Sequence, residues 1–93
     1  MIIGLVRATL SLPESRSLKD KRRVLRSLKD RTLNRMNVSV AEVGRQDQWQ
    51  MAEMAFVTVA AEAQVVQQRV SEICSMLQTS AHFLLVDLQT ENI

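Results

Sequence analysis

The chain has few of the residues on which disulfides, metal sites and stacking surfaces depend. It contains one cysteine, one histidine, two phenylalanines, one tryptophan and no tyrosine. A single cysteine, Cys74, excludes an internal disulfide or a zinc site with several cysteine ligands, and it suits a reducing compartment. Because His82 has no cysteine or second histidine at ligand spacing, we expect neither a metal nor another cofactor.

Long hydrophobic segments are also missing. No apolar run approaches the roughly 18–20 residues that a membrane helix needs. The N-terminus has no basic region followed by an apolar core, so we expect no signal peptide. These absences predict a cytoplasmic protein with no membrane partner, and a length of 93 residues predicts a single domain over 1–93.

Positive charge is concentrated in one stretch of the chain. Residues 15–35 read SRSLKDKRRVLRSLKDRTLNR, in which nine basic residues minus two acidic ones give +7, whereas the whole chain carries only +2. Ser17 is a natural N-cap, and Asp20 stands at the capping-box position. The segment from Leu18 to about Arg35 has apolar residues at helical spacing and no glycine or proline, which predicts an amphipathic helix. Its expected core-facing residues are Leu18, Val24, Leu25, Leu28, Thr32, Leu33 and Met36.

The remaining elements follow from apolar periodicity. Alternation predicts strands over 2–12, 37–43, 51–60 and 82–89, and helical spacing predicts a second helix over 61–78. The polar segment 44–48 is expected to be a hairpin loop. The order βαββαβ predicts an α+β, ferredoxin-like two-layer sandwich. With right-handed crossovers, its antiparallel sheet has the strand order 4-1-3-2 and both helices on one face.

Two segments resemble the YlxP-like bacterial family, a domain of unknown function (503). They are residues 15–25, SRSLKDKRRVL, and residues 37–43, NVSVAEV, followed by DQWQ at 47–50. The resemblance implies a ferredoxin-like domain in the bacterial cytoplasm. Genes of this family often stand beside those for translation initiation and ribosome assembly, which implies RNA or a ribosomal subunit as partner. The family has no established catalytic residues to carry over, and this chain differs from relatives in its Gly44-Arg45 turn and short C-terminal tail.

The basic helix is the main candidate site. Like-charge pairs at i, i+4, such as Lys19 with Arg23, disfavour the isolated helix, so we infer a polyanionic partner. With no aromatic pair on the central strands, we expect phosphate contacts that read shape and not base sequence. Alternatives are an acidic protein partner or a basic surface balanced by Glu42, Glu53 or Glu62. The residues expected to bind nucleic acid are Arg16, Lys19, Lys21, Arg22, Arg23, Arg26 and Lys29.

The sheet face opposite the helices is a second candidate. An apolar patch there would suit a homodimer or another protein partner. The residues expected at this interface are Leu5, Met54, Phe56 and Leu85. For Trp49, in the hairpin loop, we favour a cap over the core, with a stacking contact as the alternative.

An enzymatic role is the least favoured hypothesis. Acylphosphatases share the expected fold and use an arginine in the first loop with an asparagine on the second strand. Arg16 and Asn37 are crudely placed for this. However, residues 12–17 contain no glycine to cradle a phosphate with backbone amides. We therefore expect a protein that is not an enzyme.

Overall fold

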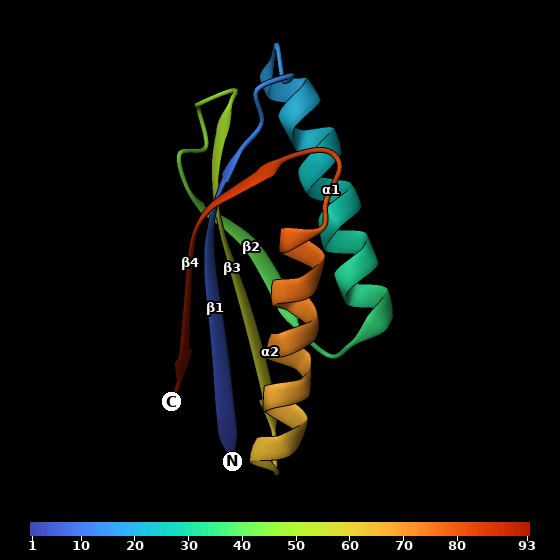
Figure 1. The fold of residues 1–93 in the computed structure, drawn as a ribbon, viewed down its shortest axis with the longest axis vertical. Helices are drawn as coiled ribbons and strands as arrows, with labels where there is room; N and C mark the ends of the chain where they lie inside the picture. Colours follow the sequence, from blue (N-terminus) through green and yellow to red (C-terminus); the bar gives the residue numbers. More distant parts are fainter.

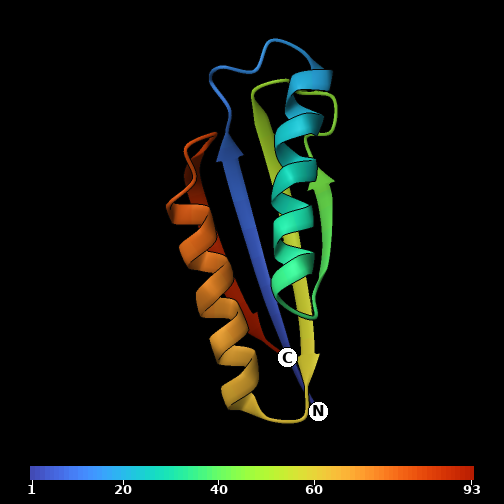
Figure 2. The same cartoon turned by 90° about the vertical axis from the view of Figure 1, so that its right-hand side faces the viewer.

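The computed structural model describes all 93 residues and has the predicted order of elements. The elements are β1 (Ile2–Ser11), α1 (Leu18–Arg35), β2 (Ser39–Gly44), β3 (Met51–Ala60), α2 (Ala63–Gln78) and β4 (Leu84–Asn92). The four strands form one antiparallel sheet in the order β2-β3-β1-β4, and both helices cover the same face (Figures 1 and 2). The predicted ferredoxin-like α+β fold is confirmed.

Element boundaries agree with the predicted ones to within three residues, and the largest difference is at the C-terminus. β4 runs to Asn92, three residues beyond the predicted end at Gln89. The reason lies in backbone pairing with β1. Ile3 and Ile93 exchange both backbone hydrogen bonds, at 3.2 and 2.8 Å, so the chain end is held in the sheet.

The register of the sheet decides which side chains form the core. Val6 on β1 is buried under the helices and lies opposite Phe56 on β3, while Ala8 lies opposite Met54. Directly opposed residues share a face of the sheet. Phe56 and Met54 are therefore core residues, 1% and 2% exposed.

The predicted interface set was consequently wrong at three positions. Met54 and Phe56 belong to the core, and Leu85, opposite buried Leu10, packs against the same core. Only Leu5, opposite Val57, lies on the open face. Substituting Phe56 would therefore disrupt folding and could not test an interface.

Both helices dock through apolar stripes, and α2 approaches the sheet most closely. A Cβ atom added at Gly4 on β1 would lie 2.6 Å from Val66 Cγ1, so this strand position needs a glycine.

α1 begins after Ser17, whose Oγ accepts a hydrogen bond of 3.1 Å from the Asp20 amide. Leu33 was expected in the stripe of α1 but is 43% exposed. Neither helix combines the length and hydropathy needed to cross a bilayer.

Candidate nucleic-acid interface

Lys21 was predicted to contact nucleic acid but is fully buried between α1 and the β2–β3 hairpin. Its Nζ lies 2.8 Å from Glu42 Oε2. The same atom donates to the backbone carbonyl oxygens of Arg45, Gln46 and Met51 at 2.8, 3.3 and 3.2 Å. An ammonium group has three hydrogens, and here it has four oxygen neighbours. Lys21 therefore fastens the hairpin to the helix, and its predicted role was wrong.

The positions of buried Lys21 and half-buried Glu42 follow from spacings already present in the sequence. Lys21 precedes Leu25 by four residues and Leu28 by seven, so all three lie on the core-facing side of α1. Glu42 follows Val38 and Val40 at period two, which turns it toward the helices. Spacing thus outweighs residue type at both positions, and it was the signal that could have revealed this pair.

The other six predicted cations remain exposed, and none of them forms an ion pair. The ion pairs of the chain are Lys21–Glu42, Arg35–Glu72 and Arg45–Glu53. Glu42, Glu53 and Glu62 were the acids expected to balance the charge of the helix, and none of them forms an ion pair with these six cations. We call the exposed set the basic flank, and it comprises Arg16, Lys19, Arg22, Arg23, Arg26 and Lys29.

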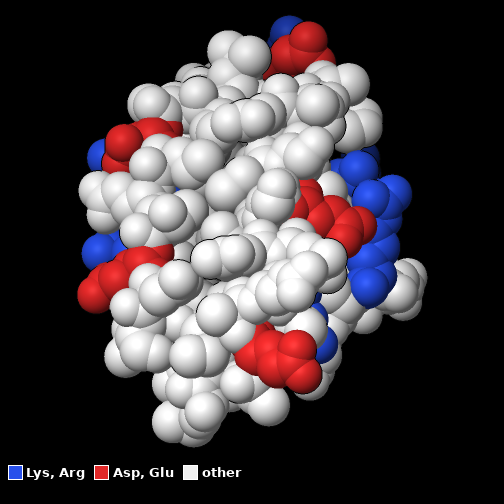
Figure 3. Space-filling model, turned by 60° about the horizontal axis from the view of Figure 1, so that its bottom comes forward, with Lys and Arg blue, Asp and Glu red and all other residues white.

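Part of the basic flank lines a groove between α1 and the sheet edge at β2. The groove has a volume of about 340 Å³. Three cations, Arg22, Arg26 and Lys29, line it from the helix together with Asp30, and Val40, Ala41 and Glu42 line it from the strand. The largest group of Lys and Arg atoms in Figure 3 lies along the side of the molecule where α1 is seen in Figure 1. An elongated anion could therefore follow α1 while contacting several cations.

Arg31 and Arg35 lie on the other flank of α1 and face α2. Arg35 Nη1 is 3.4 Å from Glu72 Oε1, and both arginines line a separate groove with Glu72 and Ser75. Their charge is thus partly balanced and lies away from the basic flank. This contrast within a single helix supplies a matched control for charge-reversal experiments.

The β2–β3 hairpin loop is held on both sides of Trp49. The Gln50 side chain donates to the carbonyl oxygens of Pro13 and Ser15, both at 3.2 Å. On the other side, the Gln48 amide donates to the Arg45 carbonyl at 3.0 Å. Between these anchored residues the Trp49 side chain is 54% exposed and takes no part in the core. The predicted role of Trp49 as a cap over the core was therefore wrong.

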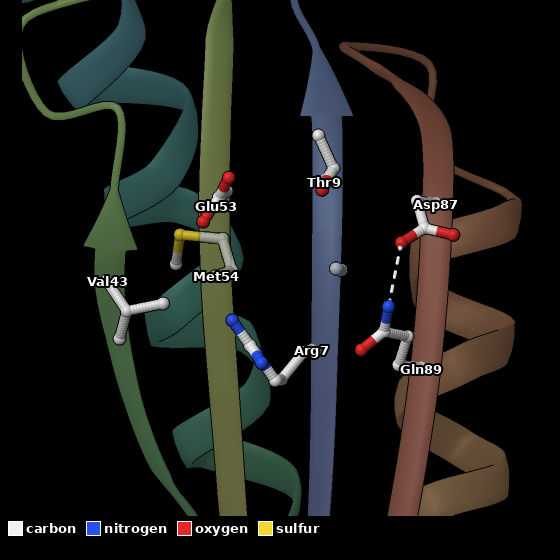
Figure 4. Close-up of a pocket in the computed structure, with 8 residues that line it drawn as sticks. Arg7, Thr9, Val43, Glu53, Met54, Asp87 and Gln89 are labelled. Carbon is white, nitrogen blue, oxygen red and sulfur yellow. Dashed lines mark hydrogen bonds between the residues drawn. The ribbon is translucent and has the colours of Figure 1, made fainter.

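The open face of the sheet carries apolar and charged side chains together. Figure 4 shows a hollow there, with Arg7 directed from β1 toward β3, and Asp87 and Gln89 on β4. Its volume of about 150 Å³ is small against the roughly 300–1,000 Å³ of typical small-molecule sites. This hollow alone therefore does not identify a ligand.

The residues considered for catalysis do not come together. Arg16 precedes α1 and Asn37 follows it, so an 18-residue helix of about 27 Å separates them. The pair weighed for an acylphosphatase-like site therefore cannot share one phosphate. Cys74 is half-buried, and burial raises the pKa of its thiol, which disfavours the reactive thiolate. No three His, Cys, Asp or Glu side chains gather as metal ligands would.

Comparison with known proteins agrees with the resemblance seen in the sequence. Residues 3–90 match the family model described as "Protein of unknown function (DUF503)". The chain is also similar to "Uncharacterized protein YlxP" of Bacillus subtilis (strain 168), with 27% identity over 78 residues, which covers 84% of this chain and 85% of that protein. The match to nearly the whole domain shows that the chain belongs to the DUF503 family.

Proposed function

We propose that the protein binds RNA, as a free molecule or within a ribosomal subunit, through phosphate contacts along α1. The observation that carries this proposal is the basic flank, which has five exposed cations on α1 and Arg16 just before it, without an ion pair among them. Each ion pair formed with a phosphate of a nucleic acid releases counterions, and this release favours binding. A surface with several unpaired cations therefore suits a polyanion.

Packing of α1 supports the same interpretation. The core-facing stripe fixes the helix on the sheet, so its cations present a preformed row and not a flexible tail. From Lys19 to Lys29 the row extends over ten residues, about 15 Å along the axis. The groove beside it places Arg22, Arg26 and Lys29 on a common wall. A nucleic-acid backbone is a linear anion that suits this arrangement.

Salt dependence tests the proposal directly. Binding of a fluorescein-labelled single-stranded RNA, followed by anisotropy, should weaken steeply as salt rises. With four to six phosphates neutralised, the slope of log K against log salt should be about −3 to −4, since each phosphate contributes about −0.7. A slope near zero, or no binding at low salt, would contradict the proposal.

The open sheet face supports a second candidate function, self-association. Leu5 lies opposite Val57, and Ile3 opposite Val59, which is 48% exposed. The face also holds both signs of charge, including Arg7 and Glu53, so two copies related by a two-fold axis can place opposite charges against each other. The basic flank, in contrast, carries one sign and would repel a second copy.

Val57→Glu tests this second function. The Val57 side chain is 41% exposed, so the substitution should leave the monomer folded while placing a charge in the expected interface. Light scattering should then show a dimer for the natural chain and a monomer for the variant. Gln68→Glu adds the same charge on the exposed outer surface of α2, away from this face of the sheet, and should leave the dimer intact. A natural chain that is monomeric at micromolar concentration would exclude this function.

A further inference from the structure

Trp49 is the feature that the phosphate-binding proposal leaves unexplained. An indole is large and mostly apolar, and exposing it to water has a free-energy cost that burial would avoid. Trp49 is nevertheless 54% exposed and is absent from the core cluster. It is also the only tryptophan, in a chain without tyrosine.

The hairpin loop around Trp49 is ordered by contacts with the basic helix and the loop before it. Lys21, on the first turns of α1, donates to the carbonyl oxygens of Arg45 and Gln46 at 2.8 and 3.3 Å and to that of Met51 at 3.2 Å. Trp49 lies between these anchor points in sequence. The indole is thus presented by a loop whose order does not depend on a ligand.

The same contacts place Trp49 at one end of the basic flank. Gln50, the next residue, donates to the carbonyl oxygens of Pro13 and Ser15, and Arg16 follows directly. Figure 2 shows the hairpin and the start of α1 at the same end of the molecule. The hairpin therefore carries its exposed aromatic residue at the end of the molecule where the basic flank begins.

We propose that Trp49 stacks on an unpaired base of a single-stranded nucleic acid whose phosphates follow the basic flank. This inference rests on the proposed function and adds the ligand class, a strand with an accessible base and not a fully paired duplex. Cations beside an aromatic ring form the combination by which proteins bind single strands with little sequence preference. In this proposal the cations of α1 contact phosphates only, as expected from the sequence, whereas Trp49 in the hairpin contacts a base.

Intrinsic fluorescence tests the inference because emission reports on Trp49 alone. Oligouridylate, which has unpaired bases, is compared with heparin, a polyanion without bases. We expect oligouridylate to quench the emission and heparin to leave it unchanged when both are bound. Trp49→Ala should lower the oligouridylate affinity relative to the heparin affinity about 5- to 150-fold, and Trp49→Phe should restore most of the loss.

The outcomes separate this inference from the proposed function. If both polyanions bind with a steep salt dependence but oligouridylate does not quench, or Trp49→Ala keeps the natural affinity ratio, base stacking is wrong and phosphate binding stands. Equal quenching by heparin also overturns the stacking. If neither polyanion binds, the proposed function fails and the inference fails with it.

Discussion

Replacing Lys21 by methionine should lower the free energy of unfolding by about 3–5 kcal/mol, because it takes the cation from the half-buried Glu42 carboxylate and the donor from three carbonyl oxygens. Methionine keeps similar length but supplies no charge and no hydrogen-bond donor. Glu42 Oε2 is buried and has no hydrogen bond to another group, so it would lose the only cation beside it. The carbonyl oxygens of Arg45, Gln46 and Met51 would lose a donor as well. For a domain whose total stability is about 5–15 kcal/mol, this loss is large.

Urea unfolding followed by far-ultraviolet circular dichroism measures this effect. Arg22→Met is the matched control, since it makes the same kind of change at the next, exposed position and should stay within about 0.5 kcal/mol of the natural chain. Lys21→Met/Glu42→Leu should recover part of the loss, because no half-buried carboxylate is left without its cation. It should not recover all of the loss, because three carbonyl oxygens still lack a donor. A loss below about 1 kcal/mol for Lys21→Met would refute the fastening role.

Reversing two charges of the basic flank should have the largest effect on binding. We expect Arg22→Glu/Arg26→Glu to weaken RNA binding about 100-fold or more, since two charge-assisted contacts are lost and two repulsions are added. The salt slope should also become shallower by about 1.4 for single-stranded RNA. Both residues line the groove beside β2 and are exposed, so the fold should persist.

The matched control lies on the same helix. Arg31→Glu/Arg35→Glu changes the net charge by the same amount at the same i, i+4 spacing, but on the flank that faces α2. If binding depends on the basic flank, this control should weaken RNA binding far less than Arg22→Glu/Arg26→Glu. Equal weakening by the two variants would show that only net charge matters, and the assigned surface would be wrong.

The predicted fold was confirmed because periodicity carried most of the information. Val6, Ala8 and Leu10 alternate on β1, and no proline or glycine interrupts α1, so element types and order follow from local pattern. β3 was harder, since both of its faces are apolar. Only the register, which sets Phe56 against buried Val6, decides which face enters the core. The register is the alignment of residues between two strands that are far apart in sequence. The pattern of a single strand does not contain this information.

The candidate site was also predicted only in part. The exposed cations on α1 were predicted by helical spacing, whereas Lys21 was assigned by its charge although its spacing placed it in the apolar stripe. Its partner Glu42 comes from another element, and the carbonyl oxygens come from a loop whose path is set by folding. The exposure of Trp49 depends on the same loop. These features arise from the assembled structure and not from any one segment.

The buried ammonium of Lys21 gives the hairpin a cation that is covalently tethered and cannot exchange with the solvent. Dissolved ions screen exposed charges strongly but screen buried pairs much less. The two kinds of positive charge on α1 should therefore respond differently to ionic strength. A rise in salt that displaced the proposed polyanion from the basic flank would therefore leave the hairpin in place, and the surface would stay shaped to bind it again.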